Sequence, residues 1–220
     1  VVLELASPDG DMGFPGDLRV EVVYSLDRRG DLTIDYRATC DRPTVLNLTQ
    51  HAYWNLAGGG PVADHELAVE ADAYLPIDAD GIPLGPAEPT AGTPFALAGP
   101  LGDAMTADHP QITAAKGVDH CYVLRGGRTD LPRRVATLTH PGSGRVMHTW
   151  TTEPGLQVYT ANHLGPPFEP HSAVCLETQH FPDAPNRPAY PSVVLRPGEV
   201  HRSSTSYRFG TRGPAGPPRN

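Results

Sequence analysis

Residues 17–38 read DLRVEVVYSL DRRG DLTIDYRA, two runs of alternating side chains on either side of a short turn. Successive residues of a strand point to opposite faces, so Leu18, Val20 and Val22 share one face of the first run. The second run alternates in the same way, and the turn between the two ends in Gly30. This pattern predicts an antiparallel β-hairpin.

Nine further stretches are of strand type: 43–50, 65–71, 120–124, 134–140, 145–152, 156–160, 173–178, 192–195 and 203–209. Clusters of Gly, Pro and Asp separate them, and only a short turn near 103–108 is of helical character. Many short strands with frequent turns predict an all-β fold, a sandwich or a large antiparallel sheet. We expect one domain over 1–210 and a disordered tail over 211–220, where apolar residues are scarce.

Composition excludes several classes of protein. The 220 residues hold 17 Lys plus Arg against 25 Asp plus Glu, a formal net charge of −8, and Lys116 is the single lysine. Without a basic run, neither a nucleic acid nor an anionic membrane surface is an expected partner. No apolar run reaches the roughly 18 residues of a membrane span, so we expect a cytoplasmic protein. The 23 Gly and 25 Pro predict many turns and few long helices.

The stretch 47–58, NLTQHAYWNLAG, is unusually polar for a predicted strand. A strand continuing from Pro43 to Trp54 would direct Leu46 and Leu48 to the core. It would direct four polar side chains to the opposite face: Asn47, Thr49, His51 and Tyr53. Such a row suits a neutral polyhydroxyl ligand, which needs planar hydrogen-bonding groups and aromatic faces. The alternative is that His51 is a structural histidine at a strand end.

A carboxylate interrupts the apolar stretch 173–178, AVCLET. Glu177 alternates with Leu176, so it faces away from the core among side chains that favour partial burial. Burial raises the pKa of a carboxyl group and makes it a usable general base, although a surface charge is the alternative. His180 follows three residues later and falls on the other face, and no histidine pair has ligand spacing. We therefore expect no metal site.

Two further segments place polar groups on strands. GVDHCYVL (117–124) begins a buried-looking strand with Asp119, which is alternatively a turn or capping residue. GLQVYTAN (155–162) places Gln157 and Tyr159 on one face, although Gln157 could also be merely solvated. Four strands with a polar side opposite an apolar side indicate one shared polar cleft.

These segments, with CLETQHFPDAPNRPAYPSVVLRPGE (175–199) and the opening SPDGDMGFPGDLRVEVVYSL, resemble the signature segments of the aldose 1-epimerase (galactose mutarotase) family. The resemblance follows the family's order from about Ser7 to Phe209. It implies a large antiparallel β-sandwich, the galactose mutarotase-like supersandwich. It also implies interconversion of the α and β anomers of free aldohexoses such as glucose and galactose, without metal or other cofactor.

By the same resemblance, His51 matches the family's general acid and Glu177 its general base. Five other residues match sugar-contacting positions: Ala52, Tyr53, Trp54, Asp119 and Gln157. The family's upstream strands, a sugar-contacting Arg and a second His have no counterpart among these segments. The sequence is therefore expected to represent about the C-terminal two-thirds of the family domain, without its N-terminal strands. It is expected to be a fragment of a longer protein; the alternative is a shortened member with an incomplete cleft.

Two alternative functions remain open at this stage. One is a sugar-binding β-sandwich module without turnover. The other is a relative that acts on hexose 6-phosphates, which would need Arg or Lys at the cleft; Arg125, Arg128 and Arg187 are more simply read as surface charges. The expected partner is a small-molecule sugar, and the expected state is a monomer or weak homodimer.

Overall fold

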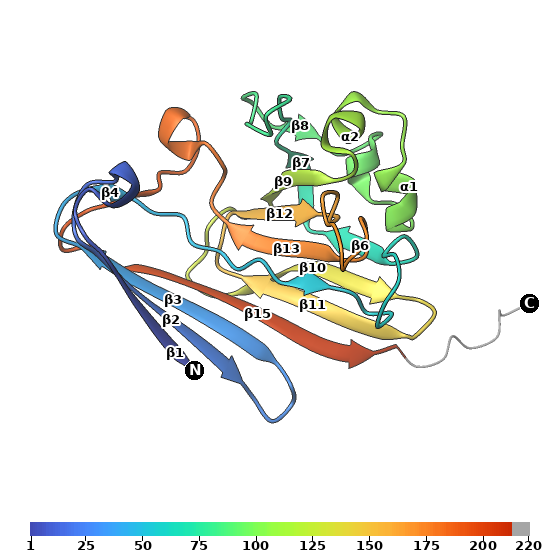
Figure 1. Ribbon diagram of the computed structural model, residues 1–220, viewed down its shortest axis with the longest axis horizontal. Coiled ribbons are helices and arrows are strands. Elements are labelled where there is room, and N and C mark those ends of the chain that lie inside the picture. Colours follow the sequence, from blue (N-terminus) through green and yellow to red (C-terminus); the bar gives the residue numbers. More distant parts are fainter. Residues whose placement is uncertain (213–220) are drawn as a thin grey trace, which may run out of the picture.

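The computed structural model describes residues 1–212, and within them the chain is built mainly of antiparallel strands in two sheets (Figure 1). The first sheet has the order β1 (Val2–Ser7), β2 (Leu18–Leu26), β3 (Leu32–Cys40), β15 (His201–Thr211), β11 (Arg145–Thr151), β10 (Arg133–His140), β6 (Glu66–Val69). The second has the order β5 (Tyr53–Trp54), β13 (Val174–Gln179), β12 (Gly155–Tyr159), β9 (Asp119–Leu124), β7 (Ala71–Tyr74), β8 (Glu88–Pro89). A small pair joins β4 (Thr44–Val45) to β14 (Val194–Leu195). The predicted all-β sandwich is confirmed.

The predicted hairpin is confirmed as β2 and β3, which pair from Leu18↔Cys40 to Leu26↔Leu32. β1 adds to the outer edge of β2, an element that the sequence patterns did not reveal. These three strands extend away from the second sheet in Figure 1, and the β1 side chains Val2, Leu3 and Leu5 are exposed.

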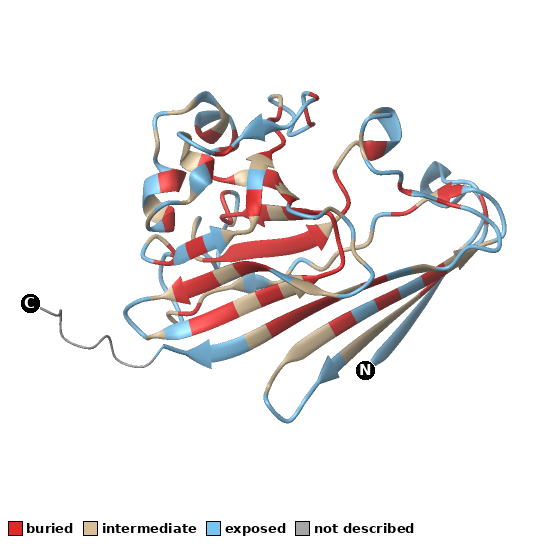
Figure 2. Cartoon of the chain, turned by 180° about the vertical axis from the view of Figure 1, so that it is seen from behind, coloured by how far each residue is buried: buried red, intermediate tan, exposed pale blue. Residues whose placement is uncertain are grey.

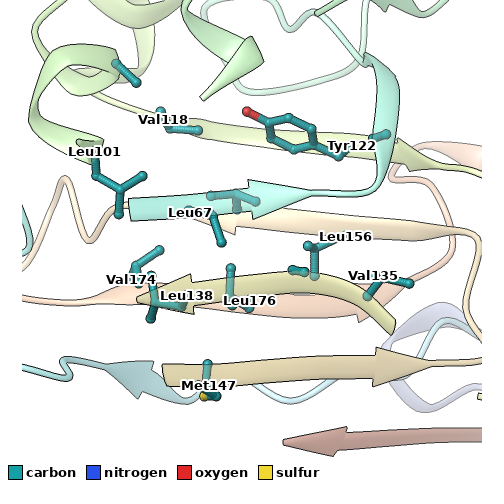
Figure 3. Close-up of a cluster of buried hydrophobic side chains, with 14 of the residues drawn as sticks. Leu67, Leu101, Val118, Tyr122, Val135, Leu138, Met147, Leu156, Val174 and Leu176 are labelled. Atoms are coloured by element: carbon teal, nitrogen blue, oxygen red, sulfur yellow. The ribbon is translucent and has the colours of Figure 1, made fainter. Parts of the chain in front are cut away.

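The core lies where the two sheets face each other. Leu138 and Met147 from the first sheet and Leu156 and Leu176 from the second are all inaccessible to solvent. Figure 3 shows these side chains converging in one cluster, and Figure 2 shows burial concentrated where the sheets overlap. Burial of these apolar side chains is the main force that holds the two sheets together.

The expected strand over 43–54 is wrong. Only β4 and β5 are strands, and the residues between them form no ladder. Side chains replace the missing backbone pairing. The Asn47 side chain forms hydrogen bonds with the backbone of His180. The Gln50 amide nitrogen donates to the hydroxyl of Tyr207, and its amide oxygen accepts from the backbone N–H of Ala52. Leu46 and Leu48 nevertheless pack against the core as expected.

The helical content exceeds the single short turn predicted near 103–108. The chain forms α1 (Leu101–Met105) and α2 (Pro110–Ala115), with 3-10 helices at Asp11–Gly13, Pro94–Ala96 and Ala184–Asn186. α2 begins with Pro110, whose fixed backbone angle suits the first helical position. Within the described residues, no helix is both long and apolar enough to cross a membrane. The tail predicted over 211–220 lies outside the described residues, except for Thr211, which ends β15, and Arg212.

We expect Leu138→Ala to destabilise the fold, because Leu138 is fully buried between the sheets. Truncation of a buried leucine costs about 2–5 kcal/mol, combining lost burial with the cavity left behind. Urea unfolding measures the change. Leu131→Ala, at a side chain that is 78% exposed, is the matched control and should shift stability by less than about 0.5 kcal/mol. Equal effects of the two substitutions would contradict this placement of the core.

Candidate active site

One face of the second sheet gathers the predicted polar residues, because strand register aligns them in rows. One row crosses four strands at directly paired positions: Tyr53, Cys175, Tyr159 and Asp119. In the next row Glu177 of β13 lies opposite Gln157 of β12. Side chains of directly paired residues lie on the same face of a sheet. The two rows therefore form one continuous polar surface on this face of the second sheet.

The opposite face of the same strands is apolar and closes the core. Leu176, Val158 and Leu156 alternate with the polar residues and are fully buried. The period-two expectation for β12 and β13 is thus confirmed. Each strand separates the polar face from the core by its pleat.

His51 reaches this face from the irregular segment between β4 and β5. Its Nε2 lies 3.5 Å from Oε1 of Glu177, and its Nδ1 lies 3.4 Å from Sγ of Cys175. The imidazole also packs against the rings of Tyr53 and Tyr159, with centroids 4.9 and 5.9 Å away. The side chain of His51 is 49% exposed and that of Glu177 only 10%, so the pair joins a buried carboxyl to an accessible imidazole.

A two-point amide contact holds the His51 segment against His180, the residue that follows β13. Asn47 Nδ2 donates to the carbonyl oxygen of His180 at 3.1 Å, and the backbone N–H of His180 donates to Asn47 Oδ1 at 3.0 Å. The His180 ring is itself buried, with Nδ1 2.6 Å from a carboxylate oxygen of Glu153. The segment bearing His51 is therefore anchored near the end of the strand that bears Glu177.

Asp119 is positioned at the start of β9 by a buried polar network. Asn162 donates to the carbonyl oxygens of Ala115 and Val118 and accepts from Thr160. A Cβ on Gly117, whose φ is +143°, would come within 2.5 Å of Asn162 Oδ1, so only glycine leaves room for this network.

Gln157 and Asp119 form the second polar pair of the site. The amide nitrogen of Gln157 donates to Oδ1 of Asp119 at 2.7 Å. The amide oxygen of Gln157 is buried without a hydrogen-bond partner among residues 1–212. A buried acceptor without a donor is costly, so this oxygen is suited to receive a hydroxyl hydrogen from a ligand.

Burial perturbs both carboxyl groups in the same direction. It raises the pKa of Glu177 above its ordinary value of 4.5; the nearby His51 acts against the shift, whereas Asp119 adds to it. Burial also raises the pKa of Asp119, opposed by the hydrogen bond from Gln157. Perturbed carboxyl groups in a cleft are typical of functional sites.

The structure brings His51, Tyr53, Asp119, Gln157 and Glu177 together. Ala52 lies between two of these, with its backbone N–H held by Gln50. Trp54 does not join them: it follows Tyr53 on β5, faces the first sheet and packs on Tyr207 and Phe209 with centroids 4.9 and 5.6 Å away. Adjacent strand residues necessarily point to opposite faces.

Sequence reasoning placed Tyr159 on the same face as Gln157 but gave neither Tyr159 nor Cys175 a role in the site. Cys175 contacts His51, and the hydroxyl of Tyr159 accepts a hydrogen bond from the backbone of His163. The signal was present in the alternation, since Cys175 shares a face with Glu177 and Tyr159 shares one with Gln157. Neither residue type by itself indicates a site.

The sequence model of the aldose 1-epimerase family matches residues 1–208. The chain belongs to the aldose 1-epimerase family. It is 43% identical over 213 residues to the galactose mutarotases of Homo sapiens and Bos taurus, covering 92% of this chain and 60% of each relative. It is 37% identical over 221 residues to the aldose 1-epimerase of Escherichia coli, covering 95% of this chain and 63% of that relative.

Solved structures of similar proteins agree with this family assignment. The GalM/aldose epimerase homologue from C. elegans superposes with a TM-score of 0.86 at 29% identity, over 97% of this chain and 66% of that one. Galactose 1-epimerase from Lactobacillus acidophilus superposes with a TM-score of 0.84 at 28% identity, over 96% and 62%. The chain thus spans about 60% of the length of the curated galactose mutarotases that it matches.

For this member of the aldose 1-epimerase family, we expect Glu177→Gln to raise the free energy of unfolding at pH 7. The folded-state pKa of Glu177 lies above the ordinary 4.5, so its ionisation costs the folded state more than the unfolded chain. This cost is absent below pH 4.5 and grows as pH rises through the folded-state pKa. The gain from glutamine should therefore disappear at pH 4. Urea unfolding at the two pH values measures it.

Glu66→Gln, at an exposed carboxylate of β6, is the control and should change stability little at either pH. A Glu177→Gln protein less stable than the parent at pH 7 would contradict the assignment of a net burial cost.

Proposed function

We propose that this protein is an aldose 1-epimerase that interconverts the α and β anomers of free aldohexoses, with glucose and galactose as substrates. One observation carries the proposal: His51 Nε2 and Glu177 Oε1 lie 3.5 Å apart and share the polar face of the second sheet. A proton donor and a proton acceptor can therefore reach a single bound hemiacetal. The family to which the chain belongs supports the choice of reaction.

The proposed reaction consists of two proton transfers and their reversal. The Glu177 carboxylate accepts the proton of the C1 hydroxyl, while protonated His51 donates one to the ring oxygen. The C1–O5 bond breaks and the sugar opens to an aldehyde. Rotation about C1–C2 presents the other face of the carbonyl. The ring oxygen then attacks C1, His51 recovers its proton, and Glu177 returns one to the new C1 hydroxyl. Both residues end in their starting states.

The environment of Glu177 suits the role of base. Burial raises its pKa, so its carboxylate binds a proton more strongly than an exposed glutamate does. A base is most effective when its pKa approaches the working pH. Asp119 carries a second negative charge on the same face, which adds to the proton affinity of Glu177.

The neighbouring polar groups supply contacts for the sugar. We propose that Asp119 and Gln157 accept hydrogen bonds from sugar hydroxyls, with the buried amide oxygen of Gln157 as one acceptor. Tyr53, which is 46% exposed beside His51, offers an aromatic face to C–H groups of the ring.

The charges of the structure favour a neutral sugar over a hexose phosphate. The guanidinium of Arg125 is bound by Glu70 and Asp72, and that of Arg187 by Asp183. A phosphate would need free cationic donors at the cleft. We further propose that the substrate is drawn from the free sugars of the cytoplasm.

We expect Glu177→Gln and His51→Asn each to lower the rate of anomer interconversion by about 10²–10⁴-fold, the typical contribution of one positioned acid or base. The decay of optical rotation of fresh α-D-glucose or α-D-galactose measures the rate. Glu66→Gln is the control and should retain the parent rate. Unchanged rates in both site variants would refute the assigned roles. Sugar binding without any rate acceleration would instead support a non-catalytic module.

The rate should fall on the acid side with an apparent pKa above 4.5. Protonation of Glu177 removes the base, and burial raises the pKa at which this occurs. The dependence of kcat/KM on pH, corrected for spontaneous mutarotation, reports this value for the free enzyme. An acid limb centred below pH 4.5 would mean that another group controls the rate.

A further inference from the structure

Three side chains of the site offer one metal-ligating atom each, from His51, Cys175 and Glu177, and these atoms lie within 4.8 Å of one another. Imidazole nitrogen, thiolate sulfur and carboxylate oxygen are the three donor types that zinc accepts in proteins. The proton-transfer mechanism uses two of these side chains and leaves Cys175 without a role.

The separation of the nitrogen and sulfur atoms already fits a common tetrahedral ion. His51 Nδ1 and Cys175 Sγ are 3.4 Å apart. Zinc holds nitrogen at about 2.0–2.1 Å and sulfur at about 2.3 Å, which places two such tetrahedral ligands about 3.5 Å from each other. These two ligands would need almost no rearrangement.

The third ligand has the freedom to complete the set. Cys175 and Glu177 lie two residues apart on β13 and project from the same face. Oε1 of Glu177 now faces Nε2 of His51, and the broad terminal torsion of a glutamate allows its carboxylate to turn toward the Nδ1 side. Because His51 is accessible to solvent, an ion can enter and keep water as its fourth ligand.

We propose that a soft divalent cation of the zinc class binds to His51, Cys175 and Glu177 and inhibits the enzyme. On binding, the Cys175 thiol releases its proton to solvent as the sulfur–metal bond forms. The metal also takes up the lone pair of the His51 nitrogen and a carboxylate oxygen of Glu177. Metal occupancy and proton transfer to the sugar therefore exclude each other. The inhibition rests on the function proposed above, whereas the metal site itself does not.

The donor set also predicts selectivity. Thiolate and imidazole favour zinc, cobalt and copper, whereas magnesium and calcium prefer all-oxygen sites. Zn²⁺ and Co²⁺ should therefore bind, and Mg²⁺ at the same concentration should have no effect.

Co²⁺ titration of the chain tests the site without reference to activity. We expect a near-ultraviolet sulfur-to-cobalt charge-transfer band together with the visible bands of four-coordinate cobalt, both displaced by Zn²⁺. Cys175→Ala and Cys175→Ser should abolish the charge-transfer band. Cys40→Ala, which removes a thiol on β3 in the other sheet, should leave it unchanged. Glu177→Gln should weaken cobalt binding by about tenfold or more.

Absence of the band in the parent protein, or its persistence in both Cys175 variants, would overturn the proposal. Far-ultraviolet circular dichroism shows whether each variant is folded. If Cys175→Ala does not fold, Cys175→Ser carries the test, because serine is similar in size to cysteine. The charge-transfer band reports metal binding even in a protein without measurable epimerase activity. Failure of the metal site and failure of the proposed function can therefore be distinguished.

Inhibition is measured on the anomerisation rate. Zn²⁺ should suppress the rate, and a chelator should restore it. The rate of each protein is first normalised to its own metal-free rate. Cys175→Ser should then raise the Zn²⁺ concentration for half-inhibition by about 10–100-fold relative to the parent protein. Equal Zn²⁺ sensitivity of the parent and Cys175→Ser would exclude inhibition through this site.

Discussion

The pleat of the second sheet is the constraint on which the site depends. Along β13 and β12, alternate residues face the core or the polar face of the sheet, so one backbone geometry produces both a dry interior and a polar surface. A shift of one residue in the pairing would turn Glu177 into the core and Leu176 onto the polar face. The fully buried leucines of these strands therefore fix the orientation of the candidate base, although they take no part in its chemistry.

Burial of Glu177 connects stability to the proposed activity. The same desolvation that raises the pKa of this carboxyl group penalises its ionised form in the folded state. His51 partly offsets that penalty by facing the carboxylate at 3.5 Å. A fold selected only for stability would place a neutral residue at this position, whereas a proton-transferring site requires the charge.

The loop that carries His51 shows where local patterns fail. Alternation over 43–54 is compatible with a strand, yet the structure forms only β4 and β5 at its ends. Asn47 hydrogen-bonds the backbone of His180, which follows β13, and Gln50 hydrogen-bonds Tyr207 of β15 and the backbone of Ala52, so the backbone between them need not pair. His180 and Tyr207 lie far away in the sequence, and no periodicity within the segment reveals them as partners. Trp54 was matched to a sugar-contacting position by the family resemblance. In the structure it instead packs on Tyr207 of the first sheet.

The sequence by itself determined the hairpin, most of the other strands and the polar and apolar faces of β12 and β13. These features depend on alternation between neighbouring residues, which any strand must follow. Only the tertiary structure decided that His51 meets both Glu177 and Cys175, that Gln157 bonds Asp119, and that Tyr159 packs against His51. Those contacts join residues that are distant in the chain. They depend on strand order and register, which the packing of the whole sandwich sets.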